Sequence, residues 1–289
     1  LVLGNNGALG SGALTVSGNG TLDGTAALNL GNAVNLTGSL TLPGAQNLTL
    51  GGVVAGTGSL VKNGASVLTL TGTNTFSGGL TLNAGSLLLG NSTSLGSGAL
   101  NVNGAATLDG LTALNLANNI ALGGGASLTL PGNQATTLGG VVSGTGALVK
   151  NGASTLTLNG ANTFSGGLSL NAGGLLLGNA GALGTGALNV AGNTTLDSSV
   201  ALTLGNGVNL TGGAVLDLLG SQDVTLGGVI AGTGELVKNG ASTLTLNGPN
   251  TFSGGVGLNA GVLRLGNAGA LGTGALDVGG NASLDASAA

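Results

Sequence analysis

The side chains that could carry acid–base chemistry are few in this chain, and they recur at wide, regular intervals. The sequence holds eight acidic and four basic residues but no Cys or His, which excludes thiolate nucleophiles, Ser–His–Asp triads and zinc sites built on those ligands. Polysaccharide-cleaving enzymes need two carboxylates within several Å of each other. Four aspartates follow Thr-Leu or Ser-Leu and stand 86, 88 and 88 residues apart: Asp23, Asp109, Asp197 and Asp285. This spacing favours solvated turn positions over a catalytic pair.

The basic residues follow the same interval. Lys62, Lys150 and Lys238 stand 88 residues apart, each in the sequence LVKNG just before an expected turn. We expect each lysine either to extend its ammonium to solvent or to hydrogen-bond a carbonyl group at the turn. The preceding Gly-rich residues are superficially similar to a phosphate loop, but GxxxxGK[ST] is absent and no helix follows. With a formal net charge of −4, the chain is also a poor partner for nucleic acid.

One copy of the sequence carries charges that the preceding copy lacks. Asp217, Asp223, Glu235 and Arg264 stand where Thr129, Ala135, Ala147 and Leu176 stand 88 residues earlier. Asp217 lies between two leucines and is expected to face outward. The three acidic residues could bind a cation or a basic partner, although sequence drift on a solvated face is the simpler interpretation. The nonapeptide calcium motif GGxGxDx is absent.

Short β-strands must position all of these residues. Runs such as VLTLTG and GLTLNAG alternate apolar with small polar residues and end at Gly or Asn, which is the pattern of strands with one buried face. Helical spacing is absent, and 64 glycines in 289 residues oppose helix formation. No apolar run approaches the ~18 residues of a membrane-spanning helix. The outward Thr positions, among them Thr69, Thr71, Thr155, Thr157 and Thr245, are too irregular to favour an ice-binding surface.

The strands belong to a long internal repeat. The phrase at 56–85 returns nearly unchanged at 144–173 and 232–261. A fixed period of this kind predicts a stacked array in which each unit buries its apolar residues against its neighbours. We therefore expect residues 1–289 to form one continuous solenoid, divided into a partial repeat at 1–55, repeats at 56–143 and 144–231, and a partial repeat at 232–289.

A shorter rhythm predicts the coils of this solenoid. Leu60, Leu80, Leu100 and Ile120 follow one another in equal steps of about 20 residues, and Leu148 restarts the series after 28. Three short strands per step describe one coil of a parallel β-helix. The sequence thus predicts about four coils per 88-residue repeat, about 13 coils in all, and a rod roughly 60 Å long. Two residues gained around 123–125 are expected to lie in a projecting loop.

Strand parity predicts which residues fill the interior. Leu68, Leu70, Leu87 and Leu89 should point inward, whereas Thr69 and Leu88 should point outward. Asn63, Asn83 and Asn103 each follow a strand, so their side chains are expected to hydrogen-bond in a ladder from coil to coil. Phe occurs once per repeat and is expected where the lumen is widest.

The phrase GxGxLxKNGxxxLTLxGxNTFSGGLxLNAGxLxLG closely resembles the passenger-associated transport repeat, also called the autotransporter-associated β-strand repeat. It is intact at 56–90 and 144–178, and at 232–266 it has Val256 and Gly257 in place of Leu and Thr. The resemblance implies a right-handed β-helix, secretion across the outer membrane, and a place in the passenger region of a bacterial autotransporter or giant surface protein. It implies no catalytic residues, cofactors or metal ligands.

The expected function is therefore mechanical: a non-enzymatic extracellular stalk, fibre or filament. An adhesin that presents its loops to a host or matrix ligand is the alternative, and a polysaccharide-active enzyme or an ice-binding solenoid is less favoured. Both ends of the sequence fall within a repeat, so we expect a fragment of a longer protein. The apolar coils around residues 1–21 and 265–284 are compatible in sequence, which predicts end-to-end self-association. Neither nucleic acid binding nor membrane insertion is expected.

Overall fold

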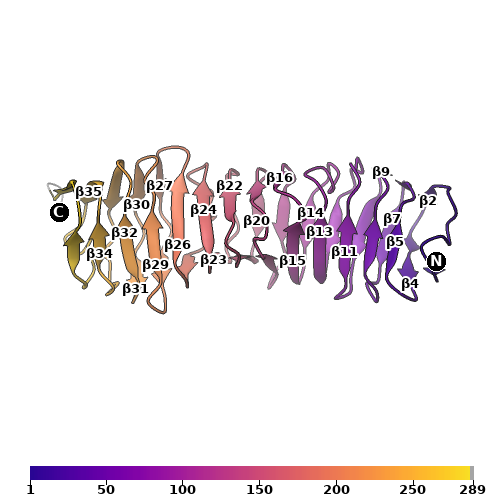
Figure 1. Ribbon diagram of the computed structural model, residues 1–289, viewed down its shortest axis with the longest axis horizontal. Coiled ribbons are helices and arrows are strands. Elements are labelled where there is room, and N and C mark those ends of the chain that lie inside the picture. Colours follow the sequence, from indigo (N-terminus) through magenta and orange to yellow (C-terminus); the bar gives the residue numbers. More distant parts are fainter. Residues whose placement is uncertain (287–289) are drawn as a thin grey trace. The chain divides into compact units, whose positions relative to one another are not determined.

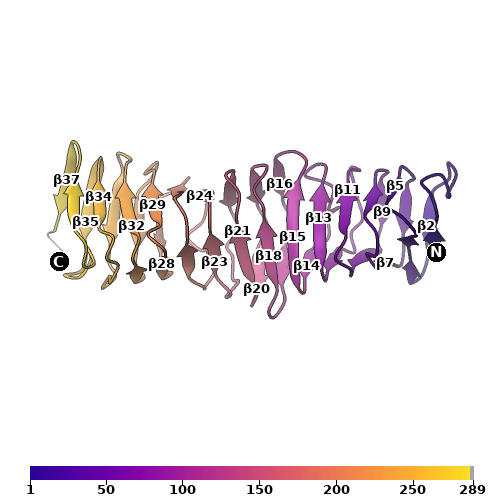
Figure 2. The same ribbon diagram turned by 60° about the horizontal axis from the view of Figure 1, so that its bottom comes forward.

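Parallel β-strands joined by short turns make up the secondary structure. The computed structural model describes residues 1–286, which contain no helix and so none that is long and apolar enough to cross a membrane. These residues form about 14 turns of β-solenoid. The chain divides into two units, residues 1–146 and 147–289. Within each unit the strands of successive coils lie side by side (Figure 1; Figure 2). The predicted all-β parallel solenoid is confirmed.

In the first unit, strands of successive coils pair into sheets. The first face contains β3 (Gly20–Thr21), β7 (Ser39–Leu42), β10 (Ser59–Lys62), β12 (Leu80–Leu82), β14 (Leu100–Val102), β17 (Ile120–Leu122) and β20 (Val142–Gly144). The second face contains β5 (Leu28–Leu30), β8 (Leu48–Leu50), β11 (Val67–Leu70), β13 (Gly85–Leu89), β15 (Ala105–Gly110) and β18 (Ser127–Leu130). The third face has two shorter ladders, β2 (Leu14–Val16), β6 (Val34–Leu36) and β9 (Val54–Gly56), then β16 (Leu114–Leu116) and β19 (Thr136–Leu138). β1 (Val2–Leu3) pairs with β4 (Asp23–Gly24).

Within the second unit the strands again fall into three sets. One contains β21 (Ala147–Lys150), β23 (Leu168–Leu170), β25 (Leu188–Val190), β28 (Val208–Leu210) and β31 (Ile230–Gly232). The next contains β22 (Thr155–Leu158), β24 (Gly173–Leu177), β26 (Thr194–Ser198), β29 (Val215–Leu218), β32 (Glu235–Lys238), β34 (Val256–Leu258) and β36 (Leu276–Val278). The last contains β27 (Leu202–Leu204), β30 (Val224–Leu226), β33 (Thr243–Leu246), β35 (Gly261–Leu265) and β37 (Ala282–Asp285).

The interior is a column of aliphatic side chains in register. Leu68 and Leu70 are fully buried and pair with Leu87 and Leu89 of the next coil, whereas Thr69 is half-exposed. The predicted alternation is therefore confirmed. Identical side chains stack because a parallel ladder repeats at about 4.8 Å, so each buried leucine packs on its counterparts above and below.

One expectation about the coils is wrong. Ile120 pairs with Val142, and not with Leu148 as the longer step would require. A ladder continues onto the strand that lies one turn away, and the coil from Ile120 to Val142 is only slightly longer than the coil from Leu100 to Ile120. Copies 88 residues apart, such as β7 and β18, share the sequence SLTL yet lie on the first and second faces of the first unit. An 88-residue repeat thus contains about four coils plus a step of one face.

The second unit shows the same step. β21 and β32 are equivalent strands 88 residues apart, and they belong to different sheets. The sequence-based prediction paired each strand with its most similar copy, whereas backbone hydrogen bonds join each strand to the strand one coil away. The two residues gained at 123–125 do lie in a turn between β17 and β18, where Gly125 has a φ of 73°.

Close stacking at the corners requires glycine. A Cβ built on Gly58 would lie 2.0 Å from the carbonyl oxygen of Gly38, and one on Gly78 would lie 2.4 Å from that of Gly58. Asparagine occupies a neighbouring corner, where Asn83 donates to Asn63 (2.6 Å) and Asn103 donates to Asn83 (2.9 Å). The predicted asparagine ladder is confirmed.

Candidate functional site: the buried lysine and asparagines of each repeat

The three lysines point into the solenoid. Lys62 ends β10 with the same parity as Leu60, and Lys62, Lys150 and Lys238 are each only 1% exposed. The expectation that they extend to solvent is wrong, because the strand alternation directs them inward and turns the preceding valine outward. Each ammonium therefore needs hydrogen-bond acceptors from the protein.

Carbonyl groups at the corner supply those acceptors. Lys62 Nζ donates to the carbonyl oxygen of Gly64, two residues on, and to that of Ala84 in the next coil at 3.5 Å. The same pair recurs in the later copies, where Lys150 reaches Gly152 and Ala172 (3.4 Å) and Lys238 reaches Gly240 and Ala260 (3.4 Å). The alternative that lysine bonds a corner carbonyl is confirmed. The KNG and NAG motifs are the two halves of this cation clamp.

Burial makes these ammonium groups easier to deprotonate. Loss of solvation lowers the pKa of Lys62 and Lys150 from the ordinary 10.5. Burial lowers the pKa of Lys238 as well, and the nearby negative charge of Asp223 partly opposes that shift. The carbonyl dipoles hold the cation but do not neutralise it.

The asparagine of the NTF motif forms a second link between coils. Asn74 is 4% exposed; its Oδ1 accepts from the N–H of Val54 (2.8 Å) and its Nδ2 donates to the carbonyl oxygen of Ser94 (2.6 Å). Asn250 makes the same two bonds, to Ile230 (2.8 Å) and Ala270 (2.6 Å). One amide thus joins the coil below to the coil above at a corner where its own segment has no strand.

Sequence reasoning missed these asparagines, as it missed a related set. Asn118 Nδ2 donates to the carbonyl oxygens of Gly96 (3.1 Å) and Gly98 (2.7 Å), and Asn206 makes the equivalent bonds to Gly184 and Gly186. The signal that could have revealed them is their 88-residue recurrence in segments without strand alternation, where backbone groups need side-chain partners.

The aspartates expected at solvated turns make local hydrogen bonds. Asp109 and Asp197 lie half-buried on β15 and β26, and each accepts a hydrogen bond from the N–H of the next residue at 2.9 Å. The other carboxylate oxygen of Asp109 accepts from Asn133 (2.5 Å), and that of Asp197 accepts from Ser221 Oγ (2.6 Å). These carboxylates fasten projecting turns to the strands, so they are more constrained than the expected solvated turn.

The charges particular to the third copy also have local partners. Asp217 accepts from Asn239 (2.7 Å), Asp223 accepts from the N–H of Thr243 (2.7 Å), and Arg264 pairs with Asp285 at 2.9 Å. Glu235 is half-exposed on β32. Within residues 1–286, no three acidic side chains gather as a metal site would require.

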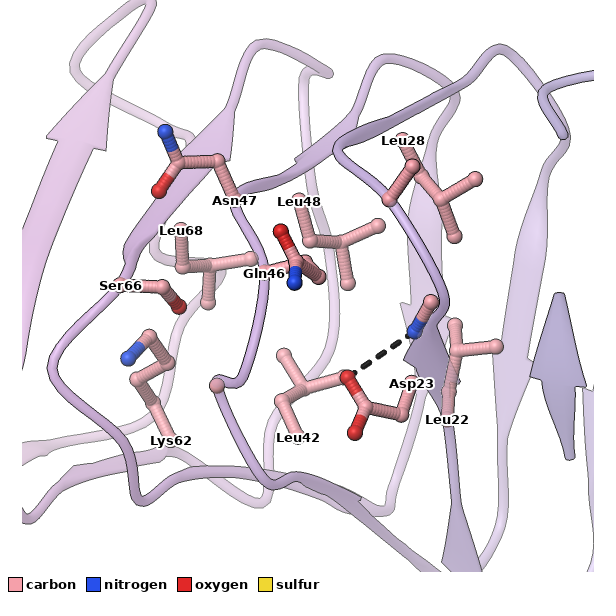
Figure 3. A pocket seen from close by; sticks show the side chains of 13 residues that line it. Leu22, Asp23, Leu28, Leu42, Gln46, Asn47, Leu48, Lys62, Ser66 and Leu68 are labelled. Carbon is pink, nitrogen blue, oxygen red and sulfur yellow. Dashed lines mark hydrogen bonds between the residues drawn. The ribbon is translucent and has the colours of Figure 1, made fainter. Parts of the chain in front are cut away.

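A small cavity lies beside the clamp. Figure 3 shows Lys62 and Ser66 on one side of it, Leu22 and Asp23 on the other, and Gln46 between them. The cavity volume is about 10 Å³, which is room for about one water molecule. Such a space cannot hold an organic substrate, and Ser66 Oγ makes no hydrogen bond to Lys62 or to any other described group. The lysine ammonium binds backbone carbonyl groups of its own corner and of the next coil, so it links successive coils.

Comparison with known proteins agrees with this arrangement. The family model of the passenger-associated-transport-repeat matches residues 60–89, 148–177 and 236–265. Each matched segment contains two successive coils whose strands pair with each other. In the first segment, β10 pairs with β12 and β11 pairs with β13. The lysine, the NTF asparagine and the NAG alanine all lie within it. None of the curated proteins and none of the solved structures compared with the chain matches it.

The buried amide allows a direct test. We expect Asn250→Ala to lower the free energy of unfolding by about 2–4 kcal/mol, because two buried backbone groups each lose their partner. Asn259→Ala, which removes an exposed ladder bond to Asn239, should cost less than about 1 kcal/mol. Denaturant titration and hydrogen exchange at the Ile230 amide would measure both effects. Equal losses in the two variants would contradict the role assigned to Asn250.

The buried lysines predict a pH dependence. Because the folded state lowers their pKa, the unfolded chain binds more protons than the folded chain between that lowered value and 10.5. The free energy of unfolding should therefore rise as pH increases through this window, and the burial penalty should be fully present below it. His, Cys and Tyr are absent, so few other groups titrate there.

The matched control removes all three amines. In the triple variant Lys62→Met, Lys150→Met and Lys238→Met, this slope should flatten. Chemical denaturation at several pH values just below the ordinary lysine pKa would measure it. A parent protein that loses stability across the window, or a variant with an unchanged slope, would show that the amines are not held at a lowered pKa.

Proposed function

We propose that this chain is a non-catalytic structural segment of an autotransporter passenger, forming coils of a stalk or fibre outside the bacterial cell. The observation that carries the proposal is that the recurring polar side chains point into the solenoid. The lysine and the buried asparagines that recur in each repeat point inward, onto backbone groups of adjacent coils. The residues that the repeats preserve thus hold the solenoid together, and among the described residues they do not converge on its surface.

The outward surface supports the same conclusion. Only 4% of the residues are charged, and the outward positions of the strands are mainly Thr, Ser, Asn and Val. Stability in such an array grows by addition of nearest-neighbour interfaces, so length can be extended without a new core. The match to the passenger-associated-transport-repeat supports a location on or beyond the cell surface.

The alternative functions find less support. Asp109 and Asp197 are hydrogen-bonded to turn residues, which disfavours a polysaccharide-cleaving centre. Asp217 and Asp223, the charges that an adhesive loop would offer, are occupied by Asn239 and by the Thr243 amide. No feature of the described residues favours ligand presentation over scaffolding.

Removal of one whole repeat tests the structural role. In the full-length surface protein, deletion of residues 144–231 joins Ser143 to Gly232 within a repeated phrase, so the ladders can re-form across the junction. We expect secretion and β structure to persist, and whole-cell binding and enzymatic activity to stay unchanged. Circular dichroism, surface labelling and activity assays on cells would measure this.

A deletion out of phase provides the control. Removal of residues 144–221 joins segments that do not match, and it should impair folding and display. If the in-phase deletion left the fold and display intact but abolished binding or catalysis by the whole protein, the repeat would be a functional module and not a spacer.

We also propose that a polypeptide limited to these residues associates end to end. Leu1, Val2, Val278 and Leu284 are 48–65% exposed in its first and last coils, and the charged side chains beside them are few, Asp23, Asp277 and Asp285 among them. Unpaired strand edges of this kind template further pairing. Sedimentation at tens of micromolar concentration should show assemblies, and Val2→Lys with Val278→Lys should dissolve them. A parent polypeptide that sediments as a monomer would refute this proposal.

A further inference from the structure

The cavity beside the lysine clamp occurs in equivalent places in both units. Its walls in the first unit include Leu22, Asp23, Gln46, Lys62 and Ser66. In the second unit the matching walls are Leu196, Asp197, Gln222, Lys238 and Ser242. Both cavities have a volume of about 10 Å³. A void that recurs with the same lining is a feature of the repeat and not a local packing defect.

Each cavity contains an unsatisfied hydroxyl. Ser66 Oγ and Ser242 Oγ are buried and have no hydrogen-bond partner among the protein atoms that the structure describes. The neighbouring lysine is a charged donor with 1% exposure, and two carbonyl oxygens accept its hydrogen bonds. An ammonium has three N–H donors, so at least one donor of each clamp is available to a further acceptor. Two polar groups with unused capacity therefore face one small space.

We propose that each of these cavities binds one water molecule, which accepts from the lysine ammonium and bonds the serine hydroxyl. The volume matches one water, and the site offers the polar partners that a buried water needs. Water both donates and accepts, so it suits a donor-only ammonium beside a hydroxyl. An anion would also face the carboxylate of Asp23 or Asp197, which makes it the poorer occupant. The water restores part of the hydration that burial takes from the lysine.

A matched pair of substitutions tests this proposal through the sign of its effect. Ser198 is 1% exposed and its hydroxyl is also buried without a partner, but it lines neither cavity. The equivalent position one repeat earlier is Gly110, so the hydroxyl is dispensable there. Ser198→Ala should raise the denaturant midpoint, because it removes an unpaired buried polar group. Ser242→Ala should lower the midpoint, because its hydroxyl is bonded to the bound water.

Direct observation of the water completes the test. Water-oxygen magnetic relaxation dispersion on the whole chain should detect long-lived internal water, and the signal should fall in Ser66→Val with Ser242→Val, whose added methyl groups fill the cavities. The Ser198→Ala protein should keep the full signal. Two results would overturn the proposal: a higher midpoint for Ser242→Ala, or an unchanged relaxation signal in the valine variant. A signal or midpoint that depended on chloride concentration would identify an anion and would overturn it as well.

Discussion

The solenoid depends on one constraint: every coil must present its backbone to the next coil at the spacing of a parallel ladder, about 4.8 Å. At that distance a corner has no room for side chains that point along the stack, and the column of Gly38, Gly58 and Gly78 shows the result. The interior is equally narrow, so it accepts aliphatic side chains in register. The high glycine content and the repeated leucines are therefore two consequences of the same spacing.

The buried polar groups solve a problem that this regularity creates. Strands such as SLTL and TLTL are nearly identical, so a slip by two positions would keep the apolar pattern intact. Asn74 needs the Val54 amide and the Ser94 carbonyl, and Lys62 needs carbonyl groups at its own corner and in the next coil. A slipped coil would leave these groups buried and unpaired, which is costly. We infer that the lysine and the asparagines select register, whereas the leucines supply most of the stability.

Parts of this structure follow from the sequence alone, and the reasons are physical. Alternation determines strand parity, so the inward positions of Leu68 and Leu70 and the ladder of Asn63, Asn83 and Asn103 could be predicted. The same parity places Lys62 inward, but the general tendency of lysine to reach solvent outweighed it in the prediction. Asn74 lies in a segment without alternation, and its partners belong to other coils, so only coordinates identify them. The prediction of a 28-residue coil was wrong because two similar segments need not be adjacent in space. Similarity shows that the segments are copies of one repeat, whereas hydrogen bonding joins strands one coil apart.

The step of one face per repeat also shapes the surface. In the second unit, β21 and β32 carry equivalent residues on different sheets, so a group repeated every 88 residues does not form a continuous stripe along one face. Lateral association and binding to a flat, periodic ligand both need such a stripe. A solenoid that rotates its repeats instead distributes each outward residue around its circumference, whereas its coil-to-coil contacts recur from copy to copy. The lysine and the buried asparagines of the repeat take part in these coil-to-coil contacts.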